Sequence, residues 1–95
     1  MSRVGPSAIR VAVLELLAGR AEGASACPSE VARALDAESW RELMPAVRET
    51  AADMAAARLV RVTQGPAELE PDAIATARGP VRLRRGPAFS DGADT

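Results

Sequence analysis

MPAVRETAADMAAARLVRVT, residues 44–63, decides the fold, because a helical pattern passes directly into a strand pattern within it. The first part repeats apolar or long side chains every three or four residues, which is typical of one helix face: Met44, Val47, Ala51, Met54, Ala55 and Arg58. The next residues alternate between apolar and polar, which is typical of a half-buried strand: Val60, Arg61, Val62 and Thr63. The stretch predicts a helix that runs into a strand with almost no connecting loop.

Two shorter helices are predicted upstream. Ser7 is placed to cap a first helix that runs to Ala18, with an apolar stripe of Ile9, Val13, Leu16 and Leu17. A second helix starts at Pro28, where the missing N–H costs nothing, and ends near Asp36. Glu30 is three residues after Cys27, so its carboxylate can reach back to the helix start. Between the two helices, residues 24–26 predict a short extended segment.

The region before the third helix contains the single tryptophan of the chain. Residues 37–43 predict one turn that carries Trp40, and Pro45 is expected to open the third helix. Trp40 is interpreted as a core residue between helices two and three, rather than as an exposed binding residue. It would be the one large aromatic anchor of a core rich in small residues.

Downstream, Gly65-Pro66 ends the strand that begins at Leu59 and runs to Gln64, and a long loop follows. Within that loop Pro71–Ile74 predicts one helical turn, with Ile74 against the core. A second strand at Val81–Arg84 is expected to pair antiparallel with the first and complete a wing. The order predicts a winged helix-turn-helix: a mainly α protein with a small β-hairpin (α+β), three helices plus the wing. The predicted core contains Trp40, Val47, Met54, Leu35, Val60, Val62, Val81 and Leu83.

The chain of 95 residues is long enough for one domain. We expect a leader at 1–6, the domain at 7–85 and a disordered tail at 86–95. One cysteine and no histidine exclude a disulfide framework and a Cys/His zinc site, so no metal and no cofactor are expected. No apolar run approaches the roughly 18 residues of a membrane span, and no signal peptide is recognisable. The expected location is the cytoplasm.

The residue types also argue against an enzyme. The chain has no His, Tyr or Lys, so acid–base work would fall on carboxylates or on Cys27. A thiol at a helix start is a better nucleophile than a free one, but no histidine can act as its base. A small buried residue at the helix start explains Cys27 more simply. We therefore expect no catalytic residues.

Charge is unevenly distributed although the net charge is only −1. All 12 basic residues are arginine, which a GC-rich coding bias explains as well as a need for bidentate anion contacts. Residues 1–57 contain six arginines and eight acidic residues, whereas residues 58–85 contain six arginines and three acidic residues. Any anion-binding surface is therefore expected in the second half. The candidate phosphate-binding residues of the wing are Arg61, Arg78, Arg82, Arg84 and Arg85.

Three readings of these wing arginines remain open. Like charges on one sheet face need a counter-charge. Solvent or acids of the chain could supply it, such as Glu68, Glu70 and Asp72. The backbone of a nucleic acid could supply it, with an affinity that falls as salt rises. An acidic protein partner is the third source.

The outward face of the third helix is poorly suited to sequence-specific DNA recognition. In a DNA-binding winged helix this helix enters the major groove. Here Glu49 and Asp53 would project together and repel phosphates, and small side chains cannot make bidentate base contacts. Arg48 is interpreted as a solvated charge. The same face suits a protein partner or a homodimer, since alanines permit close approach of a helix. The candidate contact residues are Ala46, Arg48, Glu49, Ala52, Asp53 and Ala56.

Several segments resemble a small uncharacterised bacterial family, a domain of unknown function: CPSEVARAL, RELMPAVR after Trp40, and ATARGPVRLR. The similarity runs from about Ile9 to Arg84 and implies a winged-helix fold. The loop after Gln64 is longer and more acidic here than in that pattern, which leaves the shape of the wing tip open. The family supplies no activity, so the functional expectation rests on the residues: a non-enzymatic binding protein, either of DNA through the wing or of a protein through helix three.

Overall fold

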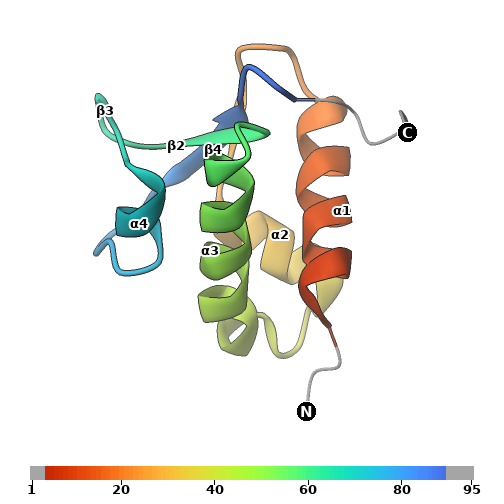
Figure 1. Ribbon diagram of the computed structural model, residues 1–95. Coiled ribbons are helices and arrows are strands. Elements are labelled where there is room, and N and C mark those ends of the chain that lie inside the picture. The colour runs from red at the N-terminus through yellow and green to blue at the C-terminus, as the bar shows by residue number, and fades with distance from the viewer. Residues whose placement is uncertain (1–3, 90–95) are drawn as a thin grey trace.

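The computed structural model describes residues 4–89. Within that range helices and antiparallel strands form a mixed α+β domain (Figure 1). In chain order the elements are α1 (Pro6–Ala18), β1 (Ser25–Ala26), α2 (Pro28–Leu35), α3 (Trp40–Ala56), β2 (Val60–Gln64), β3 (Ala67–Glu68), α4 (Pro71–Ile74) and β4 (Arg82–Arg85). The first three helices pack on one another, and α4 packs on α3.

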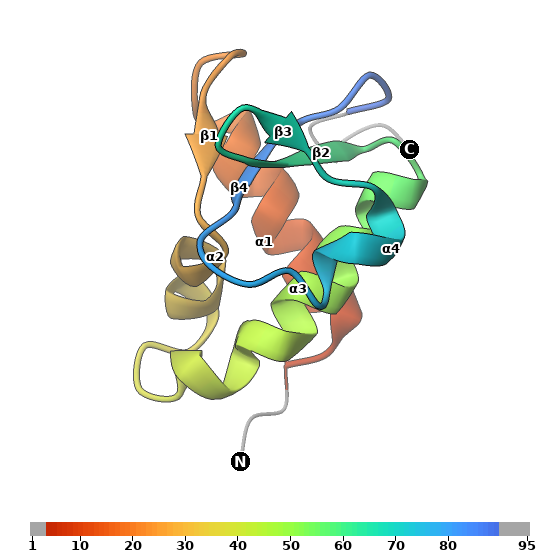
Figure 2. The ribbon, with the colours of Figure 1, turned by 90° about the vertical axis from the view of Figure 1, so that its left-hand side faces the viewer.

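The four strands form one antiparallel sheet in the order β1-β4-β2-β3, with β4 in the interior (Figure 2). The predicted segment at 24–26 is β1, and its Ala26 pairs with Leu83 of β4. The predicted hairpin is confirmed, since Val62 pairs with Leu83 in antiparallel register. The sequence did not predict β3, which folds back on β2 after the turn at Gly65, a residue with φ of 58°.

The core lies between the inner face of the sheet and the three long helices. Six of the predicted core residues are buried: Val47, Met54, Val60, Val62, Val81 and Leu83. Ile74 of α4 is also fully buried, as predicted. Trp40 and Leu35 are not core residues; both are half-buried and pack against the edge of the core. The anchor role predicted for Trp40 is therefore wrong, because large aliphatic residues such as Ile9 and Leu17 fill the centre instead.

The third helix begins earlier than predicted. It starts at Trp40, so Pro45 lies inside it rather than at its first position. The turn before it is tightened by Asp36, whose Oδ1 accepts from the backbone N–H groups of Glu38 (3.2 Å) and Ser39 (3.0 Å). This leaves no room for a separate turn around Trp40. Pro45 removes one backbone donor from the second helical turn without ending the helix.

The first helix also begins earlier than predicted. Pro6 is its first residue and Gly5 precedes it, and no side chain caps the start. The role of Ser7 as a cap is therefore wrong, because proline already occupies the first position, where no donor is needed. The expected leader is shortened accordingly, and residues 1–3 lie outside the described range.

The junction of α3 and β2 is a tight helix-terminating turn with Arg58 at its centre. The N–H of Leu59 donates to the carbonyl of Met54 (2.9 Å), and that of Arg58 to Ala55 (3.0 Å). This pair of bonds is a Schellman motif, in which Arg58 takes the left-handed conformation usual for glycine, with φ of 66°. Arg58 is exposed, so its predicted place on the inner helix face is wrong.

The segment after β4 is ordered against this junction up to Phe89. The N–H of Gly86 donates to the carbonyl of Leu59 (3.0 Å), and that of Ala88 to Arg58 (2.8 Å). Phe89 packs on the core. The expected disordered tail is therefore wrong for residues 86–89, whose backbone is paired, while 90–95 lie outside the described residues. Among the helices described, none is long and apolar enough to cross a membrane.

Candidate functional site

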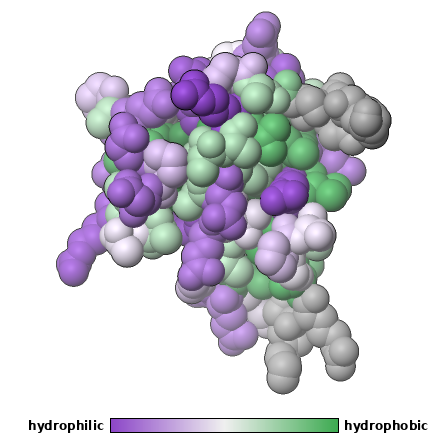
Figure 3. All heavy atoms as spheres, viewed as in Figure 1, coloured by the Kyte–Doolittle hydropathy of each residue, from purple (hydrophilic) through white to green (hydrophobic). Residues whose placement is uncertain are grey.

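The outward face of the sheet carries three of the five predicted wing arginines. Arg61 of β2 lies directly opposite Arg84 of β4, and Arg82 lies opposite Thr63. Their side chains point away from the core because the alternating residues Val60, Val62 and Leu83 fill it. In the view of Figure 3, hydrophilic side chains are frequent along the left-hand edge, where the sheet and α4 lie, whereas apolar side chains are more frequent in the upper right half. We call Arg61, Arg82 and Arg84 the sheet arginines.

Each of the sheet arginines is held by a neutral acceptor. Arg61 donates from Nε to the carbonyl of Arg85 (3.2 Å), and Arg82 from Nε to Oγ of Ser25 (2.9 Å). Arg84 donates from Nε to Oγ1 of Thr63 (3.3 Å) and from Nη1 to the carbonyl of Gly23 (3.2 Å). These bonds, with one from Nη2 of Arg82 to the carbonyl of Ser25 (3.4 Å), hold each guanidinium and leave further N–H donors unbonded within residues 4–89.

No carboxylate of residues 4–89 forms an ion pair with a sheet arginine. The ion pair found there joins Arg20 and Glu30, with 2.8 Å between Nη1 and Oε1. The expected internal partners Glu68, Glu70 and Asp72 form no ion pair in that range. The three sheet arginines therefore form no ion pair within residues 4–89, although the charge of Arg82 acts on Glu30 over a longer distance and lowers the pKa of that carboxyl. Arg61 and Arg84, which lie opposite each other, favour an anionic ligand as their counter-charge.

The other two predicted wing arginines lie elsewhere. Arg85 is one position beyond Arg84 and turns to the opposite side, where its Nη2 donates to the carbonyls of Leu17 (3.0 Å) and Arg20 (3.0 Å). Its guanidinium also stacks on Phe89, 4.7 Å from the ring centre. Arg85 thus satisfies carbonyls at the end of α1 and does not join the outward face of the sheet arginines. Arg78 is exposed in the loop before β4, and its carbonyl accepts from Nε2 of Gln64 at the end of β2 (2.6 Å).

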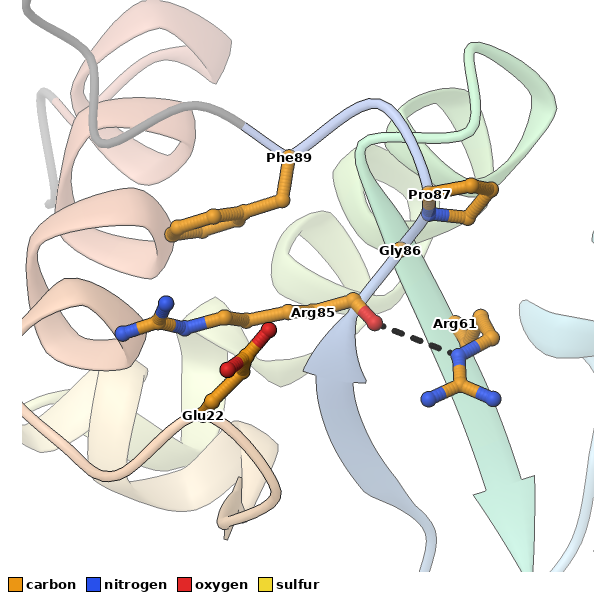
Figure 4. Close-up of a pocket in the computed structure, with 6 residues that line it drawn as sticks. All are labelled: Glu22, Arg61, Arg85, Gly86, Pro87 and Phe89. Carbon is orange, nitrogen blue, oxygen red and sulfur yellow. Dashed lines mark hydrogen bonds between the residues drawn. The ribbon is translucent and has the colours of Figure 1, made fainter.

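A hollow of about 540 Å³ lies beside Arg61 and Arg85. It is lined by Glu22, Arg61, Arg85, Gly86, Pro87 and Phe89. Figure 4 shows the two guanidinium groups pointing in opposite directions, with the carboxylate of Glu22 near the stem of Arg85. The hollow does not bring the two guanidinium groups to one ligand, because they point in opposite directions. Its geometry therefore does not favour an anion site.

The outward face of α3 is partly occupied by α4. Carboxylates of Glu49, Asp53 and Asp72 line a hollow of about 490 Å³ between the two helices. Its other lining residues are Ala52, Ala56, Pro71 and Ala75. Ala46 is half-buried and packs against the core. The predicted contact face is thus brought together in part, but as an acid-lined hollow rather than as a bare helix surface.

Arg48 has a structural role that the sequence did not predict. Its Nη1 donates to the carbonyl of Ala77 (2.8 Å) and its Nη2 to that of Gly79 (2.9 Å). The side chain therefore holds the loop before β4 onto α3. Its interpretation as a solvated charge is wrong, because loop carbonyls 29 and 31 residues away in sequence accept its donors.

Trp40 lies beside two guanidinium groups at the turn between α2 and α3. The guanidinium carbon of Arg33 is 4.3 Å from the ring centre and that of Arg41 is 4.5 Å away. Cation–π contacts of this kind stabilise exposed sites by roughly 0.5–1 kcal/mol. Two guanidinium groups therefore pack against the ring of Trp40.

The start of α2 carries the best-satisfied polar cluster. Oε1 of Glu30 accepts from the backbone N–H of Cys27 (3.1 Å), which confirms the predicted capping box. A hydrogen bond from Arg20 is the main reason that the pKa of Glu30 lies below its ordinary value, and the Cys27 N–H adds to it. Sγ of Cys27 accepts from Oγ of Ser29 (3.1 Å). Over residues 4–89 no group of three or more His, Cys, Asp or Glu side chains could hold a metal ion.

Comparison with known families agrees with the resemblance seen in the sequence. The family model described as "Protein of unknown function (DUF3253)" matches residues 6–86. The chain belongs to this DUF3253 family. No match was found among curated proteins. The matched range extends from the first residue of α1 to Gly86, so the DUF3253 domain includes both the sheet arginines and the closing contact of Gly86 with Leu59.

Proposed function

We propose that the domain is a winged helix-turn-helix. The order α1-β1-α2-α3-β2-β4 and the placement of β4 between β1 and β2 support this assignment. In that fold α2 and α3 form the helix-turn-helix, and the β2–β4 hairpin is the wing. Here the segment between the two wing strands contains β3 and α4, which returns to pack on α3.

We propose further that the domain acts in the cytoplasm by binding rather than by catalysis, and that its ligand is the phosphate backbone of a nucleic acid. The observation that carries this proposal is that no sheet arginine forms an ion pair with a carboxylate of residues 4–89. Guanidinium groups already held by neutral acceptors lose less conformational freedom when they bind, and their remaining N–H donors suit phosphate oxygens. Backbone contacts of this kind position a protein without reading sequence.

The proposal does not include sequence-specific contacts between α3 and the bases. Helix α4 packs on α3, and the carboxylates of Glu49 and Asp53 project from the same side. Arg48, the one arginine near that face, is held by loop carbonyls. We therefore expect binding that is similar for duplexes of different sequence.

The test is fluorescence anisotropy with a labelled duplex of arbitrary sequence, titrated at several salt concentrations. We expect binding by the wild type to weaken as salt rises. A variant with Arg61, Arg82 and Arg84 changed to Ser should lose about 2.7 from the slope of log K against log salt, about 0.9 for each phosphate contact. Thermal unfolding of each variant checks that it is folded.

A matched control removes the same charge from the helices instead, with Arg10, Arg33 and Arg41 changed to Ser. The control should keep most of the affinity. Equal losses in the two triple variants would show a general charge effect and contradict a site on the sheet. Absence of wild-type binding even at low salt would end the nucleic-acid proposal.

The acid-lined hollow between α3 and α4 supports a second candidate function, the docking of a protein. Its alanines permit close approach, and its three carboxylates favour a basic helical segment. Sedimentation over a range of concentrations tests the homodimer form, and titration with an Ala/Arg-rich helical peptide tests the partner form. The double variant Glu49→Gln, Asp53→Asn should abolish either association. A wild-type protein that stays monomeric and does not bind the peptide would refute both the homodimer and the partner form.

A further inference from the structure

Arg58 occupies a backbone conformation that is unfavourable for it. Among the non-glycine residues of the described range it is the one with positive φ, 66°. The position follows the last turn of α3, where glycine is usual because a Cβ crowds the following carbonyl. An arginine there gives up stability that glycine would supply. Residues in such conformations cluster at functional sites, where the surroundings hold them in place.

The surroundings of Arg58 do hold it in place. Its N–H and the N–H of Leu59 are bonded to carbonyls of α3, and its own carbonyl accepts from Ala88 (2.8 Å). Gly86 lies so close that a Cβ there would be 2.5 Å from the carbonyl oxygen of Arg58. The backbone is fixed on both sides, while the exposed side chain forms no hydrogen bond or ion pair with residues 4–89.

Arg58 and Arg61 line the same hollow. This hollow, of about 360 Å³, lies at the junction of α3 and β2, and Val60, Pro71 and Pro87 form part of its wall. Arg61 uses its Nε for the carbonyl of Arg85, which leaves both of its Nη groups unbonded within the described chain. Two arginines with open donors therefore border one hollow, next to the face of the sheet arginines.

Glu68 and Glu70 line the same hollow from the β3 side. Neither forms an ion pair with Arg58 or Arg61. Their charges oppose an anion in the hollow, so they set how closely a phosphate can approach.

We infer that Arg58 and Arg61 together form a phosphate-binding site at the α3–β2 junction, which extends the surface of the sheet arginines. This inference rests on the proposed binding of a nucleic-acid backbone and adds a residue that the sequence assigns to the inner face of α3. It also gives a reason for an arginine at a glycine position: its side chain is required on the binding surface.

The substitution Arg58→Gly separates this role from a structural one. Glycine relieves the left-handed conformation, so the melting temperature should rise by about 4 °C. The same variant should bind duplex more weakly for all sequences, with a salt slope smaller by about 1. Arg58→Lys keeps the charge and the unfavourable conformation; it should retain the wild-type salt slope and melting temperature. Glu68→Gln with Glu70→Gln should strengthen binding by removing two opposing charges.

The outcomes distinguish this inference from the proposal on which it rests. If the wild type does not bind duplex at low salt, both fail. If the wild type binds and Arg58→Gly binds equally well, the site at Arg58 fails while the sheet arginines stand. If Arg58→Gly lowers the melting temperature, the side chain is structural and the inference is overturned. A higher melting temperature with a smaller salt slope supports it.

Discussion

Gly86 shows how a single hydrogen atom can decide the packing of a strand end. Its Cα lies against the backbone of the α3–β2 junction, so a Cβ would be 2.5 Å from the carbonyl oxygen of Arg58 and 2.9 Å from the backbone nitrogen of Val60. Both are main-chain atoms. They cannot move aside without disturbing the Schellman turn or the pairing of β2 with β4.

We expect Gly86→Ala to reduce the free energy of unfolding by about 1–3 kcal/mol, the range for overpacked sites. Gly23→Ala is the matched control, since nothing lies within 4 Å of a Cβ built there. Urea denaturation of both variants measures the difference. Equal stabilities for the two variants would mean that the junction is looser than its geometry indicates.

Arg85 shows how one residue of offset changes the role of a charge. Its neighbour Arg84 points outward from the sheet, and Arg85 donates to carbonyls of α1 68 residues earlier in the chain. Strand alternation predicts that the two side chains differ in direction. It does not predict that the end of α1 lies within reach. The sequence therefore identified the three outward arginines of the sheet, Arg61, Arg82 and Arg84. It wrongly placed Arg85, the last residue of β4, with them.

At the scale of elements, α2 depends on a carboxylate for its start. Glu30 accepts from the backbone of Cys27 and from Arg20, whose Nη1 also donates to the carbonyl of Ser25 (2.9 Å). One side chain thus joins the loop after α1, the strand β1 and the first turn of α2. Because the pKa of Glu30 is lower in the folded state than in the unfolded chain, protonation favours unfolding.

The lowered pKa of Glu30 predicts how the stability of the domain depends on pH. The stabilisation by Glu30 is fully present above the unfolded-state pKa and is lost as the pH falls through the lower folded-state pKa. We expect the wild type to lose more stability than Glu30→Gln between about pH 6 and about pH 3. Thermal melts across this range measure the two slopes. Parallel curves would show that the cluster around Glu30 contributes no pH-dependent stability.

The elements that the sequence predicted well have strong local signals. The change of period near Leu59 marks the end of α3 and the start of β2, and Pro71–Ile74 marks α4. The start of α3 was misplaced because Pro45 is typical of a first helical turn, while the turn made by Asp36 has a weaker signal. The strand β3 was missed because it follows directly after Gly65-Pro66, which is typical of a strand end and the start of a loop.

At the scale of the whole molecule, the contacts that sequence reasoning missed are long-range ones. Arg48 reaches carbonyls 29 and 31 residues later, and Arg82 donates to Ser25 across a separation of 57. No periodicity encodes such pairs, because they depend on how finished elements meet. The sequence therefore predicted the candidate surface as one face of a hairpin. It did not predict the neutral acceptors that hold the sheet arginines, or the extension of the surface to Arg58.

The position of β4 has a consequence for how the chain is made. This strand lies between β1 and β2, yet it is synthesised after both. Until residues 82–85 have left the ribosome, the two earlier strands have no shared neighbour, and the apolar face of the nascent helices lacks Leu83 as a cover. The helices can form during translation, but the sheet closes only near the end of the described sequence. A pause in translation before residue 82 would hold the domain open.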